Sequence, residues 1–119
     1  MENTGYKKLI VYQKAKQLTL LVYKATKDFP RDELYGITSQ ARRAALSIAA
    51  NTVEGYVKSS RKEYVRFLDI SIGSAAELGV HLDISHELGF LKKDRFDILT
   101  DLLVEVKKLL YSYQRSLRA

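Results

Sequence analysis

The chain has 119 residues, a formal net charge of +6, one proline and no cysteine. The absence of cysteine excludes a disulfide framework, thiolate metal sites and cysteine catalysis, and it fits a reducing cytosol, so we expect a cytoplasmic protein. No apolar run approaches the roughly 20 residues that span a bilayer, and the polar first eight residues argue against a secretory signal. No predicted helix has a strongly cationic face opposite a free apolar one, which argues against membrane binding. A chain of this length is expected to form a single domain.

The first helix is predicted over residues 9–29. Its apolar residues recur at the helical period and define one stripe: Val11, Ala15, Leu18, Val22, Ala25 and Phe29. Pro30 ends the helix, because the residue before a proline is pushed out of the helical region.

The second helix is predicted over residues 33–56, with Asp32 as its cap and Glu33 in the first turn, where negative charge is favoured. It is rich in alanine and apolar over much of its girth, which is typical of a buried helix. A polar ladder nevertheless recurs at three or four residues: Gln40, Arg43, Ser47, Asn51 and Glu54. Buried polar groups need partners. We therefore expect Glu77 to accept a bond from Arg43 or another donor of this helix, and Arg43 and Glu54 to pin it against the third helix or a neighbouring subunit.

The third and fourth helices are predicted over residues 61–88 and 94–116. Ser60 to Glu63 has the Ser-x-x-Glu form of a capping box, and Gly89 suits the position after a helix end. Asp94 is the expected cap of the fourth helix. Two apolar stripes run along the third helix, so it needs two neighbours or a partner chain. Two glycines inside it, Gly73 and Gly79, are expected to allow close helix contact.

We find no segment that reads as a strand, so the fold class is all-α, an antiparallel up-down-up-down four-helix bundle. Positive charge is concentrated early in the chain: residues 1–66 hold 13 Lys and Arg against 6 Asp and Glu, and residues 67–119 hold 7 against 8. Antiparallel order collects seven cations at one end: Lys7, Lys8, Lys58, Arg61, Lys62, Arg115 and Arg118. A ring of parallel subunits would join such ends into one surface.

This polarised charge favours a polyanionic partner such as RNA or DNA, although solvated surface lysines are the alternative interpretation. No recognised binding motif is present, so contact would be mainly to phosphates and largely independent of sequence. The candidate phosphate contacts are Lys7, Lys8, Lys58, Arg61 and Lys62, with Arg42 as an outlying candidate. Tyr6, Tyr56 and Tyr64 are aromatic residues near the same end.

Catalytic and metal chemistry find little support in the sequence. No histidine lies near Ser47 in the sequence to activate it, and no glycine-rich phosphate loop is present. The segment from Asp83 to His86 resembles half of a di-iron motif, but no second copy exists. Glu77 and His81 are four residues apart, yet they are a weak pair of ligands. We expect no enzyme activity, no metal and no cofactor.

Several segments together resemble the four-helix-bundle family of proteins encoded in intervening sequences of bacterial 23S ribosomal RNA genes, sometimes labelled S23. They are Val11-Tyr12-Gln13-Lys14-Ala15, Phe29-Pro30, Tyr35 to Ala44, Ser47-Ile48, Asn51, Glu54-Gly55, Phe67-Leu68, Gly73-Ser74 with Glu77-Leu78, and Leu88 to Leu91. The departures are mild: Tyr12 stands where the family often has tryptophan, and Thr52-Val53 replaces the commoner Ile-Ala.

The resemblance implies a homopentamer arranged around a central channel, with no established catalytic activity. Related accessory proteins of diversity-generating retroelements look similar in fold, associate with a reverse transcriptase and bind nucleic acid. We therefore expect a non-enzymatic homopentamer whose basic surface binds RNA or DNA. The alternative is a protein-interaction scaffold or accessory subunit that makes no contact with nucleic acid. A small-ligand or metal site inside the bundle is a third hypothesis.

Overall fold

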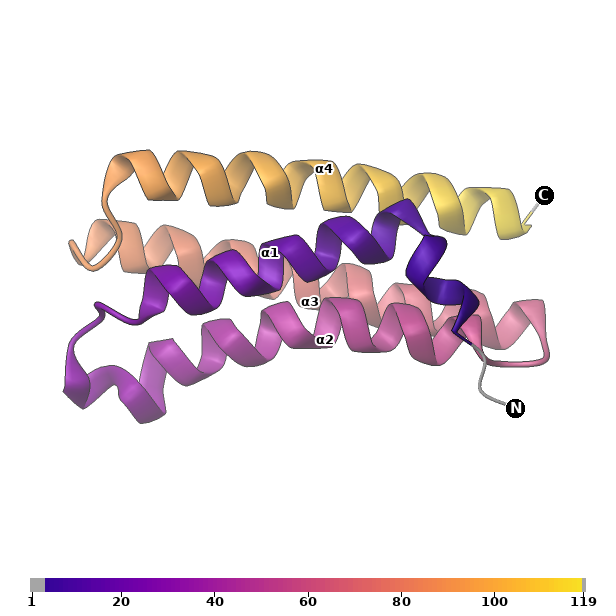
Figure 1. Cartoon of the computed structure of the whole chain (residues 1–119), viewed down its shortest axis with the longest axis horizontal. Helices are drawn as coiled ribbons and strands as arrows, with labels where there is room; N and C mark the ends of the chain where they lie inside the picture. The colour runs from indigo at the N-terminus through magenta and orange to yellow at the C-terminus, as the bar shows by residue number, and fades with distance from the viewer. Residues whose placement is uncertain (1–3, 119) are drawn as a thin grey trace.

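The computed structural model describes residues 4–118 and contains four long helices and no strand in that range. The helices are α1 (Ile10–Thr26), α2 (Ser39–Tyr56), α3 (Arg61–Glu87) and α4 (Lys93–Arg118), shown in Figure 1. Short helical turns precede α1 (η1, Gly5–Lys8) and α2 (η2, Arg31–Glu33, and η3, Leu34–Thr38). The all-α prediction is confirmed. The expectation that there is no secretory signal rests partly on residues 1–3, which lie outside the described residues.

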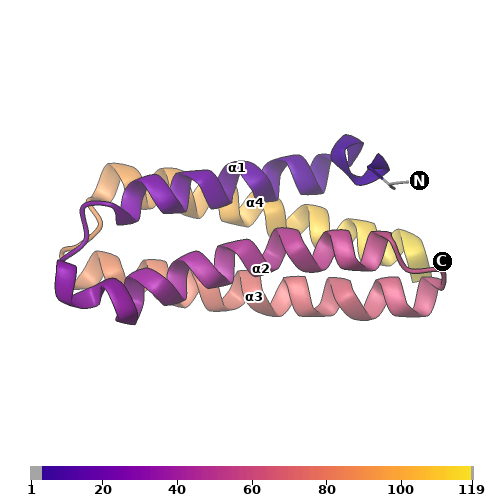
Figure 2. The same cartoon turned by 60° about the horizontal axis from the view of Figure 1, so that its bottom comes forward.

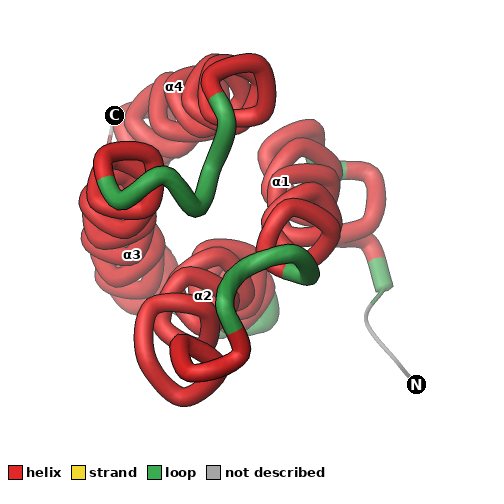
Figure 3. The backbone as a smooth tube through the Cα atoms, turned by 90° about the vertical axis from the view of Figure 1, so that its left-hand side faces the viewer, coloured by secondary structure: helices red, strands yellow, loops and turns green. Residues whose placement is uncertain are grey.

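The helices run antiparallel in chain order around the bundle axis, as the end-on view in Figure 3 shows. Each helix contacts the next one, and α4 returns to contact α1. The start of α1, the α2–α3 turn and the end of α4 therefore lie at one end of the bundle (Figures 1 and 2). Among residues 4–118, no helix is both long and apolar enough to cross a membrane.

All four helices contribute to the core. The largest fully buried side chains include Leu18, Val22, Ile48, Leu68, Leu78, Leu99, Val106 and Leu110. The predicted stripe of the first helix is buried apart from Ala25, which is partly buried. Of the two stripes on α3, one faces the core, whereas the other leaves large apolar side chains exposed: Ile70, Ile84 and Leu88.

The connection between α1 and α2 is longer than predicted. The first helix ends at Thr26, before Phe29, and the second begins at Ser39, after residue 33. Gly36 has a non-helical backbone (φ −110°, ψ −119°), which separates the short turns before it from α2. The prediction that Asp32 caps the helix is wrong, because the Glu33 carboxylate accepts the bond from the Ile37 amide, at 3.5 Å.

The remaining helix ends follow the predicted chemistry closely. The Ser60 hydroxyl accepts a bond from the Glu63 amide at 3.1 Å, and the Glu63 carboxylate pairs with Arg66 on the same helix. Gly89 has φ +81° and closes α3: its amide donates to His86, and the Phe90 amide donates to the Ser85 carbonyl. α4 begins at Lys93, so Asp94 lies within its first turn and is not the residue before it.

Close contact between α2 and α3 depends on Gly55. A Cβ atom at this position would lie 2.7 Å from Tyr64 Cδ1 and 3.1 Å from the Tyr64 carbonyl oxygen. A Cβ at Gly79 would lie at an ordinary contact distance, 3.6 Å, from Leu103 Cδ2, and a Cβ at Gly73 would meet nothing within 4 Å. The expectation that Gly73 allows close contact within the chain is therefore wrong.

These differences predict opposite effects of two glycine-to-alanine substitutions. Gly55→Ala should lower the free energy of unfolding by about 1–3 kcal/mol, because the added methyl group overpacks the α2–α3 contact. Gly73→Ala should raise it by about 0.5–1 kcal/mol, because alanine loses less backbone entropy in a helix. Urea unfolding of both variants at one protein concentration measures the effects. Equal changes in the two would show that Gly55 has no special packing role.

Candidate nucleic-acid interface

Seven exposed cations lie at the end of the bundle that carries η1, the α2–α3 turn and the end of α4 (Figures 1 and 2). We call this surface the basic end. Its residues come from η1, the α2–α3 turn, the start of α3 and the end of α4: Lys7, Lys8, Lys58, Arg61, Lys62, Arg115 and Arg118. The topology therefore brings together cations that are far apart in the sequence, as the antiparallel order predicts.

Only two of these cations have an acidic partner among residues 4–118. Lys58 Nζ lies 3.8 Å from Glu54 Oε2, and Arg118 Nη2 lies 3.9 Å from Asp69 Oδ1. Both pairs are long and exposed, and such pairs contribute about 0–1 kcal/mol at most. Arg61 and Lys62 make no ion pair in the described part of the chain. The basic end thus keeps most of its positive charge available to a ligand.

A chain of tyrosines ties the helices together at this end. Neighbouring rings meet edge to face, with centroid separations of 5.0 Å (Tyr12 to Tyr6), 6.4 Å (Tyr6 to Tyr56), 6.2 Å (Tyr56 to Tyr64) and 5.4 Å (Tyr64 to Tyr113). The Tyr64 hydroxyl donates to the Tyr113 hydroxyl at 2.8 Å. This row of tyrosine rings has one member from η1 and one from each long helix. Tyr6, Tyr56 and Tyr64, which the sequence places near this end, therefore pack against other rings.

Burial of the Tyr64 ring raises its pKa well above the ordinary value, and the hydrogen bond with Tyr113 and the nearby phenols raise it further. The neutral phenol is therefore the form that the bundle accommodates.

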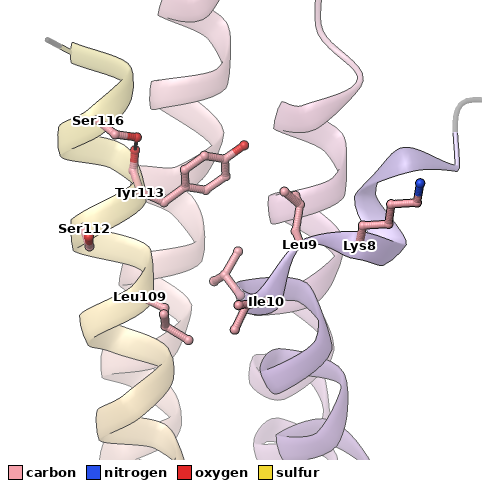
Figure 4. Close-up of a pocket in the computed structure, with 8 residues that line it drawn as sticks. Lys8, Leu9, Ile10, Leu109, Ser112, Tyr113 and Ser116 are labelled. Atoms are coloured by element: carbon pink, nitrogen blue, oxygen red, sulfur yellow. Dashed lines mark hydrogen bonds between the residues drawn. The ribbon is translucent and has the colours of Figure 1, made fainter.

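Two hollows with apolar walls flank the end of α4. One has a volume of about 310 Å³ and lies between α3 and α4, lined by Arg61, Lys62, Val65, Leu117 and Arg118. The other, of about 350 Å³, lies between the segment that joins the end of η1 to the start of α1 and the C-terminal part of α4. Figure 4 shows Leu9 and Ile10 facing Leu109 and Tyr113 across this second hollow.

Arg42 lies away from the basic end. Its Nε donates to the Thr26 hydroxyl at 2.8 Å, and its guanidinium carbon lies 4.8 Å from the centre of the Tyr23 ring. Thr26 ends α1, and Arg42 follows closely on the start of α2, so both lie toward the opposite end of the bundle (Figure 1). Arg42 therefore joins α1 to α2, and the structure does not bring it together with the other candidate phosphate contacts.

The polar ladder of α2 lines the outer groove between α2 and α3. Ser47 Oγ lies 2.7 Å from Ser74 Oγ, and Asn51 Nδ2 donates to both the hydroxyl and the carbonyl of Ser47, at 2.9 Å each. A hollow of about 300 Å³ is lined by Gln40, Arg43, Ala44, Ser47, Ser74 and Glu77. Ser47 and Asn51 thus have partners, as expected, whereas Gln40 and Arg43 face solvent.

Two expectations about α2 are wrong within the chain. The helix is not buried around its girth, because Leu46 is 46% exposed and Ala50 is also exposed. Arg43 does not pair with Glu77, the carboxylate expected to accept a bond from this helix: Glu77 contacts His81 at 3.3 Å, and Glu54 contacts Lys58. Both carboxylates take partners four residues further along the sequence, that of Glu77 within α3 and that of Glu54 just beyond the end of α2, so neither pair bridges the groove.

Residues 4–118 contain no group of three or more His, Cys, Asp or Glu side chains that could hold a metal ion. His81 and Glu77 contact each other without a third ligand. His86 instead bonds through Nδ1 to the Leu91 carbonyl at 2.8 Å and stacks on Phe96. Both histidines thus have contacts within the fold.

Sequence reasoning missed the α3–α4 hollow and Tyr111. Tyr111 is 51% exposed on α4 and follows the same side of that helix as Arg115 and Arg118. The spacing of four and three residues could have revealed this aromatic and basic stripe. The hollow depends on how α3 and α4 are rotated against each other, which no pattern in one helix reports.

The fold and its charge define a four-helix bundle with one basic end. The family described as 23S rRNA-intervening sequence protein matches residues 7–112, and the chain belongs to that family. A solved structure of a protein with unknown function from the S23 ribosomal protein family of Bacteroides thetaiotaomicron VPI-5482 is similar, with a TM-score of 0.80 and 21% identity. The match covers 88% of this chain and 98% of the other, and it shows a shared fold. A comparison with curated proteins found no match.

The buried Tyr64 phenol predicts a loss of stability in alkali. The unfolded chain releases this proton near pH 10, whereas the folded chain retains it to higher pH. Above about pH 10 the unfolded state binds fewer protons, so the free energy of unfolding falls as pH rises. Tyr64→Phe should lower stability by about 1 kcal/mol at neutral pH and weaken this alkaline decline. Urea unfolding at neutral pH and at about pH 11 measures both effects, and equally steep declines would contradict the prediction.

Proposed function

We propose that this protein is a non-enzymatic homo-oligomer whose basic end binds RNA or DNA through phosphates, with little preference for sequence. The observation that carries the proposal is the convergence of seven exposed cations from four separate segments. Five of these cations have no acidic partner in the described part of the chain. Clustered, unpaired cations on one face are the electrostatic footprint of a polyanion site.

The placement of two of these cations supports the proposal. Arg61 and Lys62 occupy the first turn of α3, where the helix dipole is positive and basic side chains are unfavourable. Neither side chain gains an ion pair within residues 4–118 in return. Their positions are therefore not explained by the stability of the helix, but they suit a site where the dipole and the side chains attract the same anion.

An exposed apolar surface on α2 supports self-association. Leu46 and Val57 are each 46% exposed, and with Tyr6, Tyr12 and their neighbours they line a hollow of about 400 Å³. Contiguous apolar surface of this kind marks interaction sites. We propose a pentamer, the assembly that the family resemblance implies, in which this surface is covered and the basic ends lie together.

The same apolar surface also fits a different protein, and this favours a second candidate function. In that case the chain is a scaffold or accessory subunit, with a partner such as a reverse transcriptase, and makes no contact with nucleic acid. The two functions differ in what the basic end does: in the first it binds phosphates, and in the second it docks a protein partner and binds no nucleic acid.

Neutralising the unpaired cations tests the first function. The double variant Arg61→Ala with Lys62→Ala should weaken binding to a fluorescent oligonucleotide and lower the slope of log affinity against log salt by about 1.4–1.8, which is two phosphate contacts. Fluorescence anisotropy at several salt concentrations measures both. The matched control, Lys92→Ala with Lys93→Ala, removes two adjacent lysines from the opposite end and should leave the slope unchanged.

Two results would count against a nucleic-acid function. One is the absence of binding by the unaltered protein even at low salt, and the other is an affinity that does not respond to salt. If the control pair lowers the slope as much as the Arg61 and Lys62 pair, phosphates are bound all over the surface and the basic end has no special role.

A charge on the α2 surface tests the assembly. Leu46→Glu should shift the molar mass toward the monomer, because a buried carboxylate without a partner is costly at an interface. Light scattering coupled to gel filtration measures the mass. Ile98→Glu is the control, since Ile98 is comparably exposed, at 53%, on α4. A monomeric unaltered protein, or an unchanged mass in Leu46→Glu, would show that this surface does not join subunits.

A further inference from the structure

An exposed tyrosine, Tyr111, lies among the cations of α4. Tyr111 is 51% exposed and makes no hydrogen bond or ring contact within residues 4–118. Lys108, Arg115 and Arg118 are three, four and seven residues away, so they share its side of the helix, and all are exposed. The tyrosines of the ring chain pack against one another, whereas Tyr111 offers its ring to solvent between positive charges.

The α3–α4 hollow continues this surface to the end of the bundle. Its apolar lining comes from Val65 and Leu117, and its cations are Arg61, Lys62 and Arg118. Its volume of about 310 Å³ is at the lower end of the range for small-ligand pockets, roughly 300–1,000 Å³. A site that contacts only phosphates needs no apolar lining, so this hollow suits the ring of an uncharged base.

The carboxylate of Asp69 lies next to the α3–α4 hollow and makes its surroundings less favourable for a phosphate than the cations alone would. Asp69 lies beside this seam, where Gln114 Nε2 donates to Oδ1 at 2.6 Å and Arg118 is 3.9 Å away. A carboxylate at this place repels a phosphate but not a neutral base. The seam between α3 and α4 therefore combines surface for bases with flanking cations for phosphates.

We infer that the basic end binds single-stranded nucleic acid in preference to duplex, with Tyr111 as a stacking platform and the α3–α4 hollow as a base site. The inference deepens the proposed nucleic-acid function and rests on it. In a duplex the bases are stacked inside and the protein meets mainly phosphates, whereas the bases of a single strand can turn outward. Stacking of bases on aromatic rings along a cationic track is a common mode of single-strand recognition.

Three fluorescent probes separate charge from base contact: a short unstructured single strand, the same strand annealed to its complement, and an abasic strand of equal length. At one salt concentration the single strand should bind at least about tenfold more tightly than the duplex or the abasic strand. If all three bind equally, the surface recognises charge alone and the inference is wrong, while the proposed function stands. If none binds at low salt, the proposed function fails as well.

Variants locate the stacking. Tyr111→Ala should weaken single-strand binding about tenfold and leave duplex binding unchanged, and Tyr111→Phe should restore single-strand binding. The matched control is Tyr35→Ala, because Tyr35 is 92% exposed near the start of η3 at the opposite end. Equal losses in the Tyr111→Ala and Tyr35→Ala variants would overturn the inference. A changed molar mass in Tyr111→Ala would also overturn it, since the ring would then serve contact between copies.

Discussion

The close contact between α2 and α3 is the constraint on which the shape of the basic end depends. Ala44 and Gly55 of α2 are buried and lie beside residues of α3, and hydroxyl groups cross the contact directly. The Ser71 hydroxyl donates to the Ile48 carbonyl at 2.9 Å and lies 3.2 Å from Thr52 Oγ1. A side-chain bond from one helix to the backbone of the other requires the two axes to lie close together, and small side chains permit that approach.

This contact also determines where the cations lie. Because α2 and α3 lie close together, a short turn joins them at the basic end, and Lys58, Arg61 and Lys62 lie in or next to this turn. The tyrosine chain then connects η1, α1 and α4 to the same place. Packing below the surface thus holds charges together that would otherwise repel one another. The charge cluster costs stability, as the cations in the first turn of α3 illustrate, and burial in the core offsets that cost.

The sequence predicts most of the fold because its strongest patterns are local. Helical periodicity, the Ser60 cap and Gly89 report interactions within a few residues, and those predictions are confirmed. α2 begins later than periodicity predicts, because Gly36 adopts a non-helical backbone that periodicity does not register. α2 is less buried than its composition predicts, because alanine packs equally well inside a core and at a surface. Antiparallel order alone predicts the basic end, but the contacts of Arg42 with Thr26 and Tyr23 and the exposure of Arg43 depend on helix rotation.

In the proposed function, association through the apolar surface of α2 raises the affinity of the basic ends for nucleic acid. Five unpaired cations on one subunit give a modest, salt-sensitive attraction, because each phosphate contact adds little beyond counterion release. If several copies associate through α2, one strand meets several basic ends, and each contact after the first forms at high effective concentration. The gain is largest when the subunits are parallel, since only then do the basic ends lie on the same side of the assembly. Under the proposed function, assembly and nucleic-acid binding are therefore linked: conditions that separate the subunits should weaken binding even though every cation remains in place.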